Sequence, residues 1–173
     1  MSEANVARVL QRTLFSDESV VAYAIIDGAS VTDLLPQLEQ YEGESCCLFA
    51  GELSDELAQT APYLVQLSED DAFSGRLLEE GWGKHWGIFA LLPADLGFRD
   101  VRKHFRSSLR VRSPDEKPLL FRYYDPRVLR VYLPSCNEEE KELIFGPVNA
   151  FIMEGETGEI IQARQHVQTN ALA

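Results

Sequence analysis

The sequence is poor in the residues that build metal and redox sites. It holds three cysteines, Cys46, Cys47 and Cys136, and three histidines. None of them form a pair with the short spacing that structural zinc sites use. Adjacent cysteines rarely bridge each other, so we expect free thiols, as in a reducing compartment. The sequence therefore predicts no metal and no cofactor, and it leaves open only a Cys–His nucleophile pair formed through tertiary structure.

Long apolar runs are also lacking. The longest uninterrupted one, residues 20–26, is far shorter than the roughly 20 residues that span a bilayer. Residues 1–5 are not basic and precede no long apolar stretch, which a secretory signal would show. We therefore expect a soluble cytoplasmic protein that has no membrane partner.

Basic residues are few and unevenly placed. The chain has 16 Lys and Arg against 28 Asp and Glu, and its net charge is −12. Residues 1–80 and 131–173 are strongly acidic, whereas residues 81–130 hold 11 of the 16 basic side chains. A basic middle either gives a dipolar surface that attracts a charged partner or packs against its own acidic flanks. The negative total and the absence of a nucleic-acid motif predict no nucleic-acid partner.

What is present is an ordinary globular composition, 45% apolar and 25% charged, in a chain of 173 residues. We expect one domain over 1–173, with an N-terminal helix over 1–16 and a C-terminal hairpin and frayed tail over 148–173. Apolar periodicity predicts helices near 34–38, 55–58, 70–80, 95–109, 126–132 and 137–145. Short apolar runs predict strands near 20–26, 45–50, 63–67 and 86–92.

The strands indicate the fold class. Residues 20–26 are apolar on both faces, which favours a central strand of a parallel sheet covered on both sides. Later the period changes to two, and residues 109–124 and 148–163 each predict a β-hairpin. The prediction is an α/β (α+β) domain: a mixed β-sheet with flanking helices, parallel in its N-terminal part, followed by β-hairpins and short helices.

Residues 121–127, Phe-Arg-Tyr-Tyr-Asp-Pro-Arg, are the most distinctive segment. Asp125 and Pro126 predict a helix start, because Asp caps helices and Pro suits the first helical position. Asp125 is also placed to pair with Arg122 or Arg127, in the bidentate geometry that arginine forms well. The segment is either a structural corner held by a buried ion pair or a surface that binds a partner.

Two further features have a functional and a structural interpretation. The predicted helix over 95–109 carries one cationic face, which either docks an acidic partner or is simply solvated. Trp82 and Trp86 flank a glycine-rich turn. An exposed Trp is a common interface anchor; we expect Trp86 in the core and leave Trp82 open. The candidate partner-binding residues are Trp82, Arg99, Arg102, Arg106, Arg110, Arg122, Tyr124 and Arg127, and the candidate structural-motif residues are Asp27, Trp86, Asp125 and Pro126.

A catalytic alternative rests on Asp27, which follows the predicted central strand. Ligand sites of α/β sheets lie at the carboxyl ends of strands, and Glu52 or Asp55 could supply a second carboxylate for acid–base chemistry. A small hydrolase or transferase of this kind requires a deep polar pocket beside Asp27. Asp27 and Gly28 are also an ordinary turn pair.

Five sequence blocks, taken in order, resemble a known family. They are residues 23–29 (YAIIDGA), 56–65 (ELAQTAPYLV), 81–89 (GWGKHWGIF), 109–112 (LRVR) and 121–129 (FRYYDPRVL). Over about residues 23–147 the chain is similar to the adaptor/chaperone family of bacterial type VI secretion, a domain long catalogued as being of unknown function.

The resemblance implies a cytoplasmic protein that is not an enzyme. Members of that family bind a toxic effector and help to load it onto the VgrG spike protein or a PAAR protein at the spike tip. Many relatives are longer and carry an additional carboxyl-terminal region. The resemblance thus implies two partners for this chain, an effector and a spike protein.

Overall fold

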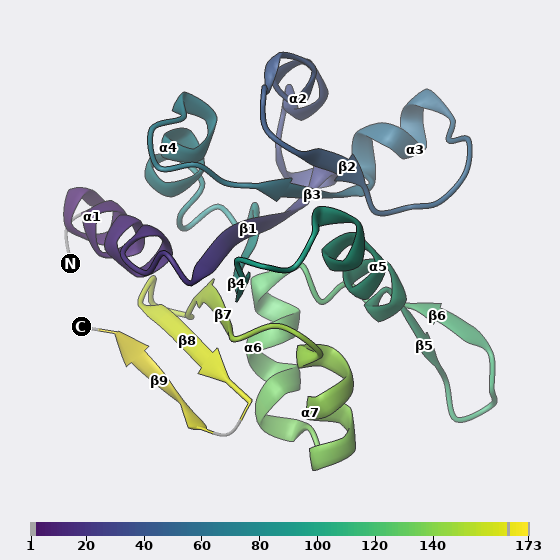
Figure 1. The fold of residues 1–173 in the computed structure, drawn as a ribbon. Coiled ribbons are helices and arrows are strands. Elements are labelled where there is room, and N and C mark those ends of the chain that lie inside the picture. The colour runs from purple at the N-terminus through teal and green to yellow at the C-terminus, as the bar shows by residue number, and fades with distance from the viewer. Residues whose placement is uncertain (1–2, 166, 173) are drawn as a thin grey trace.

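The computed structural model describes residues 3–165 and 167–172, which form a seven-stranded sheet flanked by helices and a separate two-stranded hairpin (Figure 1). The strands of the large sheet lie in the order β2-β3-β1-β4-β7-β8-β9. Their bounds are β1 Val20–Asp27, β2 Ser45–Cys47, β3 Pro62–Gln66, β4 Gly87–Pro93, β7 Ala150–Glu154, β8 Ile160–Arg164 and β9 Val167–Leu172, and the hairpin consists of β5 Arg110–Arg112 and β6 Pro118–Leu120.

The helices are α1 Glu3–Phe15, η1 Gly28–Ser30, α2 Leu34–Gln40, α3 Asp55–Thr60, α4 Ala72–Glu79, α5 Phe98–Ser108, α6 Pro126–Ser135 and α7 Glu138–Phe145. Five of the helices, η1, α3, α4, α6 and α7, begin after a residue whose side chain caps them. Asp125 caps α6 with Pro126 in its first turn, and Asn137 and Glu140 form a capping box on α7. The α5 helix starts later than predicted, after Gly97, because the chain first turns at Pro93, whose carbonyl accepts the Leu96 N–H.

The predicted α/β (α+β) class with flanking helices is confirmed, but the parallel N-terminal part is wrong. The central strand β1 pairs antiparallel with both of its neighbours, β3 and β4. Every other strand pair of the described chain is antiparallel as well, so the sheet is not mixed. The apolar run over 20–26 reports burial of both faces of the strand. An antiparallel strand between two helical layers has the same pattern as a parallel one.

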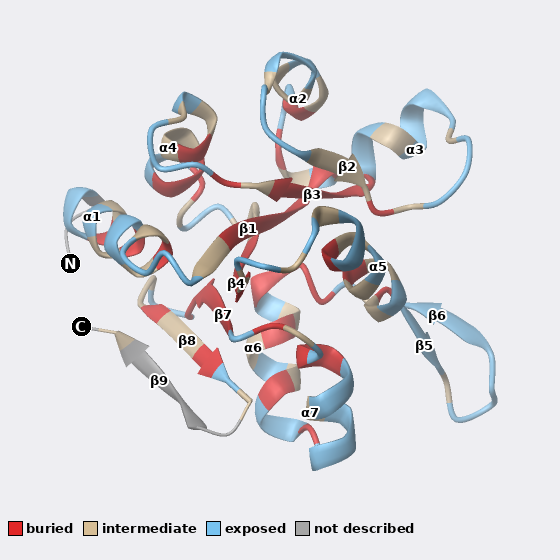
Figure 2. Cartoon of the chain, in the orientation of Figure 1, coloured by how far each residue is buried: buried red, intermediate tan, exposed pale blue. Residues whose placement is uncertain are grey.

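Alternate residues of β1 supply two separate cores, one on each face of the sheet. Tyr23 and Ile25 pack with buried residues of α5, α6 and α7. Ala24 and Ile26 pack with buried residues of α1, α2 and α4 on the opposite face. Buried residues accordingly gather on the central strands and on the inner sides of the helices (Figure 2). Burial of a large apolar side chain contributes about 1.5–3 kcal/mol, so these two cores dominate the stability of the fold.

The hairpin predictions are confirmed with different bounds. Residues 109–124 form β5 and β6, but β6 ends at Leu120. Residues 148–163 form the β7–β8 hairpin. Instead of a frayed tail, the chain continues into β9, which pairs with β8. An edge strand leaves a row of backbone N–H and C=O groups unpaired, and β9 satisfies those of β8. The last residue, 173, lies outside the described residues.

Within residues 3–165 and 167–172, no helix is both long enough and apolar enough to cross a membrane. The same residues contain no cluster of three or more His, Cys, Asp or Glu side chains arranged to hold a metal ion.

Gly87, at the start of β4, lies too close to the neighbouring strand β1 to carry a side chain. A Cβ there would lie 2.2 Å from the backbone oxygen of Ile25, whereas a Cβ on Gly75 in α4 would meet nothing within 4 Å. We expect Gly87→Ala to lower the free energy of unfolding by about 1–3 kcal/mol through the clash. Gly75→Ala should raise it by up to about 1 kcal/mol, because alanine favours the helix. Urea denaturation of both variants measures the difference, and equal effects would contradict the packing described here.

Candidate functional site

Three carboxylates are buried together at one end of the large sheet. Asp27 is the last residue of β1, Glu154 is the last residue of β7, and Asp125 immediately precedes α6. Their exposed fractions are only 2–4%. The Asp27 N–H donates to the carbonyl of Trp86, directly before β4, so the chain segments converge at this end. Burying a charge is costly unless it is paired, so the partners of these groups explain the site.

Asp27 is held by one cation and two neutral donors. Its carboxylate accepts from the Ala29 N–H and the Ser30 hydroxyl, both at 3.1 Å, and so caps the short η1 helix. The Nη2 of Arg122 donates to it at 2.7 Å. The Arg122 side chain remains 47% exposed. One edge of the guanidinium is therefore fixed by the buried acid while the rest faces solvent.

Asp125 holds the second arginine in the predicted bidentate geometry. It accepts from Nε and Nη2 of Arg127 at 3.0 and 2.8 Å, and from the Arg127 backbone N–H at 2.9 Å. Burial alone raises the pKa of Asp125, but the hydrogen bonds from Arg127 outweigh it and hold the pKa below its usual range. Of the two predicted partners, Arg127 is the close one; the Nη2 of Arg122 stays 4.0 Å from Asp125.

Glu154 is a member of the site that the sequence analysis missed. Its carboxylate accepts the His85 backbone N–H at 2.8 Å, and its other oxygen lies 3.4 Å from Nδ1 of the same residue. Burial raises the pKa of Glu154, and the charge and hydrogen bonds of His85 offset this only in part. His85 has a φ of 57°, a left-handed conformation that turns its N–H toward the carboxylate. The sequence feature that could have pointed to Glu154 is a single acidic residue at the end of an apolar strand.

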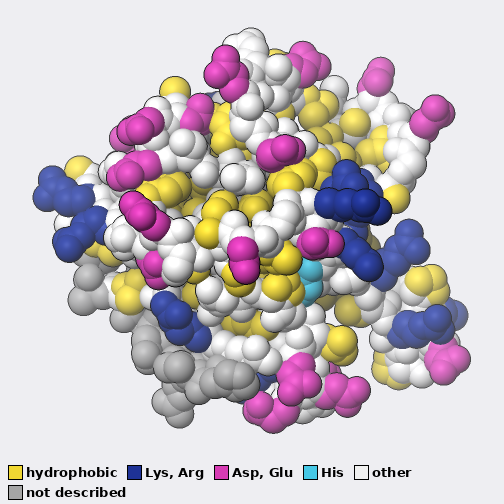
Figure 3. All heavy atoms as spheres, viewed as in Figure 1, with side chains coloured by type: hydrophobic (Ala, Val, Ile, Leu, Met, Phe, Trp, Pro, Cys, Tyr) yellow, Lys and Arg dark blue, Asp and Glu magenta, His cyan; other side chains and the backbone are white. Residues whose placement is uncertain are grey.

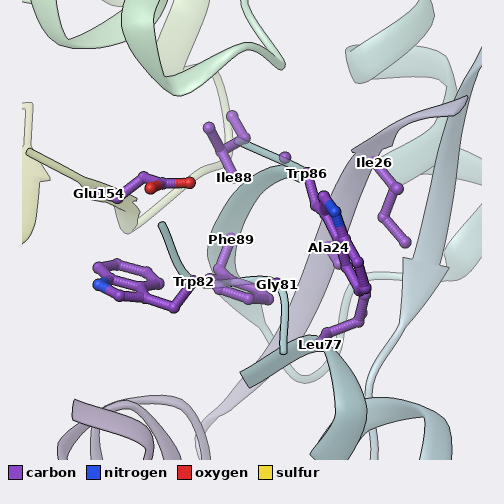
Figure 4. Close-up of a pocket in the computed structure, with 10 residues that line it drawn as sticks. Ala24, Ile26, Leu77, Gly81, Trp82, Trp86, Ile88, Phe89 and Glu154 are labelled. Atoms are coloured by element: carbon purple, nitrogen blue, oxygen red, sulfur yellow. The ribbon is translucent and has the colours of Figure 1, made fainter. Parts of the chain in front are cut away.

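Glu154 and the two tryptophans line a small cavity (Figure 4). Its volume of about 20 Å³ is enough for one water molecule and not for a metabolite. The half-buried Trp82 donates its indole N–H to the carbonyl of Gly158 at 2.9 Å. Trp86 is also half-buried, packs against the core under α1 and α4, and carries a cation over its ring, Lys84, at 5.2 Å. Both rings are therefore used in packing, and only part of each faces solvent.

Two residues that were predicted to bind a partner, Tyr124 and Arg106, have roles within the protein itself. Tyr124 is 2% exposed, so its prediction as an exposed contact is wrong. The prediction assumed that a strand continues through 124, but the chain turns there, with the Asp125 N–H donating to the Arg122 carbonyl. Arg106 is half-buried and donates to the Cys47 carbonyl at 3.0 Å, which fastens α5 to the edge strand β2.

The other predicted cations lie away from the carboxylates. Arg99 and Arg110 are exposed and Arg102 is half-exposed, on α5 and β5. Residues 81–130 form the basic middle of the chain. Among its Lys and Arg residues, only Arg122 forms an ion pair with an acidic residue of residues 3–80 or of the described residues after 130. The basic middle thus keeps most of its charge at the surface, which favours the dipolar interpretation over self-neutralisation.

Arg122 provides a test of the buried pair. We expect Arg122→Ala to lower the free energy of unfolding by about 1–3 kcal/mol, because the Asp27 carboxylate stays buried and loses its closest donor. Arg99→Ala removes the same charge from an exposed helical position and should change stability by less than about 0.5 kcal/mol. Urea unfolding at neutral pH compares the two. If both variants unfold like the wild type, the pair does not hold the fold.

Glu154 gives stability a defined pH dependence. Its pKa is raised in the folded state, so ionisation lowers stability as the pH rises from the ordinary value of 4.5 through the folded-state pKa. Glu154→Gln keeps a hydrogen-bond acceptor but cannot ionise. We therefore expect the variant to gain stability relative to the wild type as the pH rises through this window. Thermal unfolding across pH measures it, with the exposed Glu156→Gln as the matched control. Parallel curves for Glu154→Gln and the wild type would refute this.

Comparison with known proteins gives one result. The family model described as "Domain of unknown function (DUF4123)" matches residues 22–143, close to the predicted span of about 23–147. None of the curated proteins and none of the solved structures compared with the chain matches it. The matched span contains Asp27, Arg122 and Asp125, together with the whole basic middle. The chain therefore belongs to the DUF4123 family, which is associated with adaptors of type VI secretion.

Proposed function

We propose that this protein is a cytoplasmic adaptor/chaperone of type VI secretion. It binds a toxic effector and promotes loading of that effector onto the VgrG or PAAR spike before secretion. Family membership supports the adaptor class. The assignment of an effector and a spike as partners is our proposal, and so is the statement that the protein is not an enzyme.

The observation that carries this proposal is how the buried carboxylates are used. Each accepts a backbone N–H: Asp27 from Ala29, Asp125 from Arg127 and Glu154 from His85. A carboxylate acting as a general acid or base must reach a substrate. These three groups instead fix the backbone at one end of the sheet. This structural use of the three buried carboxylates supports a function carried by the exposed surface.

The catalytic alternative requires a deep polar pocket at Asp27, and Asp27 lines none of the five main pockets of residues 3–165 and 167–172. The groove beside η1 is lined by residues from Gly28 to Pro36 and by Gln59 and Thr60, and Asp27 is not part of its wall. Glu52 and Asp55 are exposed and belong to the loop and helix at the start of α3. Because the Asp27 carboxylate is already bound by three donors, we do not favour a hydrolase or transferase at this position.

The exposed surface suits a protein partner. Lys and Arg side chains gather over α5 and the β5–β6 hairpin (Figure 3). In a chain of net charge −12, such a patch steers an acidic surface toward one face of the molecule. Binding of this kind weakens as salt screens the charges, and that suits a partner that must later be released.

Deletion of the gene in the native host tests this function. We expect loss of delivery of one toxic effector while delivery of other type VI effectors continues, and restoration of delivery by the wild-type gene. Secretion assays and killing of competitor cells measure both. Normal delivery after deletion would contradict the proposal, as would turnover of a metabolite by the purified protein.

The contribution of the cationic face is measured in the same strain. Arg99→Glu with Arg102→Glu should reduce recovery of the effector with the tagged adaptor at low salt, because both side chains lie on the accessible face of α5. Arg8→Glu with Arg12→Glu makes the same charge change on exposed positions of α1 and serves as the matched control. Equal recovery with both double variants would exclude this face.

A further inference from the structure

The exposed apolar side chains of this protein are concentrated around the β5–β6 hairpin. Six large hydrophobic residues are exposed in the described chain: Leu57, Val111, Leu119, Leu120, Val131 and Leu143. All except Val131 line one of two grooves beside the hairpin. Scattered exposed leucines are normal, but a cluster on one feature marks an interaction surface.

The hairpin has little of its own to stabilise it. All six residues of its strands are exposed, so neither of its faces is covered by the rest of the protein. It projects from the end of α5 (Figure 1). In the turn that closes it, the Ser113 N–H donates to the Lys117 carbonyl and the Lys117 N–H donates to the Ser113 hydroxyl. An isolated two-stranded hairpin is marginally stable in water. A partner that covers the hairpin would bury Leu119 and Leu120 and would thereby stabilise the hairpin.

The larger groove lies between the hairpin and the segment that leads from β2 into α3. Its volume is about 660 Å³, which accommodates several side chains. One wall carries Leu119 and Leu120, and the other carries Phe49, Leu53 and Leu57. This hairpin groove is thus a predominantly apolar channel with an apolar wall on each side.

The charges of the hairpin groove are of one sign. Its charged lining residues are Arg106 and Arg110. Arg110 is exposed, and Arg106 is anchored by its bond to the Cys47 carbonyl. Arg112, also exposed, follows on the same strand. An apolar channel that carries only cations complements a segment with large apolar side chains and neighbouring carboxylates.

We propose that the hairpin groove binds a segment of the effector that combines large apolar side chains with Asp or Glu residues. Its apolar side chains fill the channel between Leu57 and Leu119, and its carboxylates pair with Arg110 and Arg106. This inference rests on the proposed adaptor function and adds to it the surface and the chemistry of the recognised segment.

Removal of the apolar walls is the first test. The probe is the purified effector whose delivery the gene deletion abolishes, and calorimetry measures its binding. Leu119→Ser with Leu120→Ser should weaken binding about tenfold or more, because the residues that contribute most to binding cluster near the centre of an interface. Leu57→Ser, on the opposite wall, should weaken it as well. Val131→Ser changes a more exposed residue that lines neither groove, so this matched control should leave binding unchanged.

Charge and sequence of the bound segment are tested in parallel. Arg110→Glu should weaken binding by about tenfold at low ionic strength and by less at physiological ionic strength, whereas Arg8→Glu on α1 should have little effect. Overlapping synthetic peptides that cover the effector should bind only where large apolar and acidic residues adjoin. Thermal unfolding confirms that each variant is folded, which the exposure of the changed residues favours.

Each remaining outcome overturns the inference in an identifiable way. Tight binding of the effector by the leucine variants and the Arg110 variant would place the effector on another surface and leave the proposed function intact. No binding by the wild type would refute the proposed function together with the inference. If sedimentation shows a dimer that the leucine variants abolish, the hairpin groove binds a second copy of this chain. If the protein binds a labelled RNA and Arg110→Glu abolishes that binding, the groove binds a nucleic acid.

Discussion

The ion pair between Asp27 and Arg122 joins the central strand β1 to the turn that precedes α6. Asp27 ends the central strand, and Arg122 lies 95 residues later in the turn before α6, yet the two side chains meet at 2.7 Å. The bond neutralises a carboxylate that is almost fully buried, which would otherwise be very costly. It also fixes the entry to α6, whose buried residues complete one of the two cores. The position of α6 on the sheet therefore depends on this contact.

The same end of the sheet uses buried acids repeatedly for one purpose. Asp27 caps η1, Asp125 caps α6, and Glu154 binds the N–H of a left-handed His85. A carboxylate is a strong acceptor, and burial strengthens each of these bonds while making the unpaired acid expensive. The loops at this end are thereby held by hydrogen bonds and ion pairs to buried carboxylates. In the function proposed above, recognition uses the exposed residues of α5 and the hairpin.

Local features were predictable from the sequence because they depend on neighbouring residues. The cap formed by Asp125 and Pro126, the bidentate pairing with Arg127 and the hairpin near 109–120 all follow from contacts within a few positions. The predictions failed where distant segments decide. Strand direction needs the partner strand, so residues 20–26 were wrongly expected in a parallel pair. The burial of Tyr124 depends on the turn at residues 122–125, and the role of Glu154 depends on the position of His85, which is distant in the sequence.

By itself the sequence determined the α/β class, the family and the placement of basic charge in the middle of the chain. These properties are carried by composition, periodicity and ordered motifs, which are independent of how distant segments pack. Only the tertiary structure decided that Arg122 binds Asp27, that Arg106 is fastened to β2 and that exposed leucines from separate segments line one groove. Such arrangements depend on which surfaces the sheet and its two helical layers leave uncovered, and this follows from packing between segments that the chain separates widely.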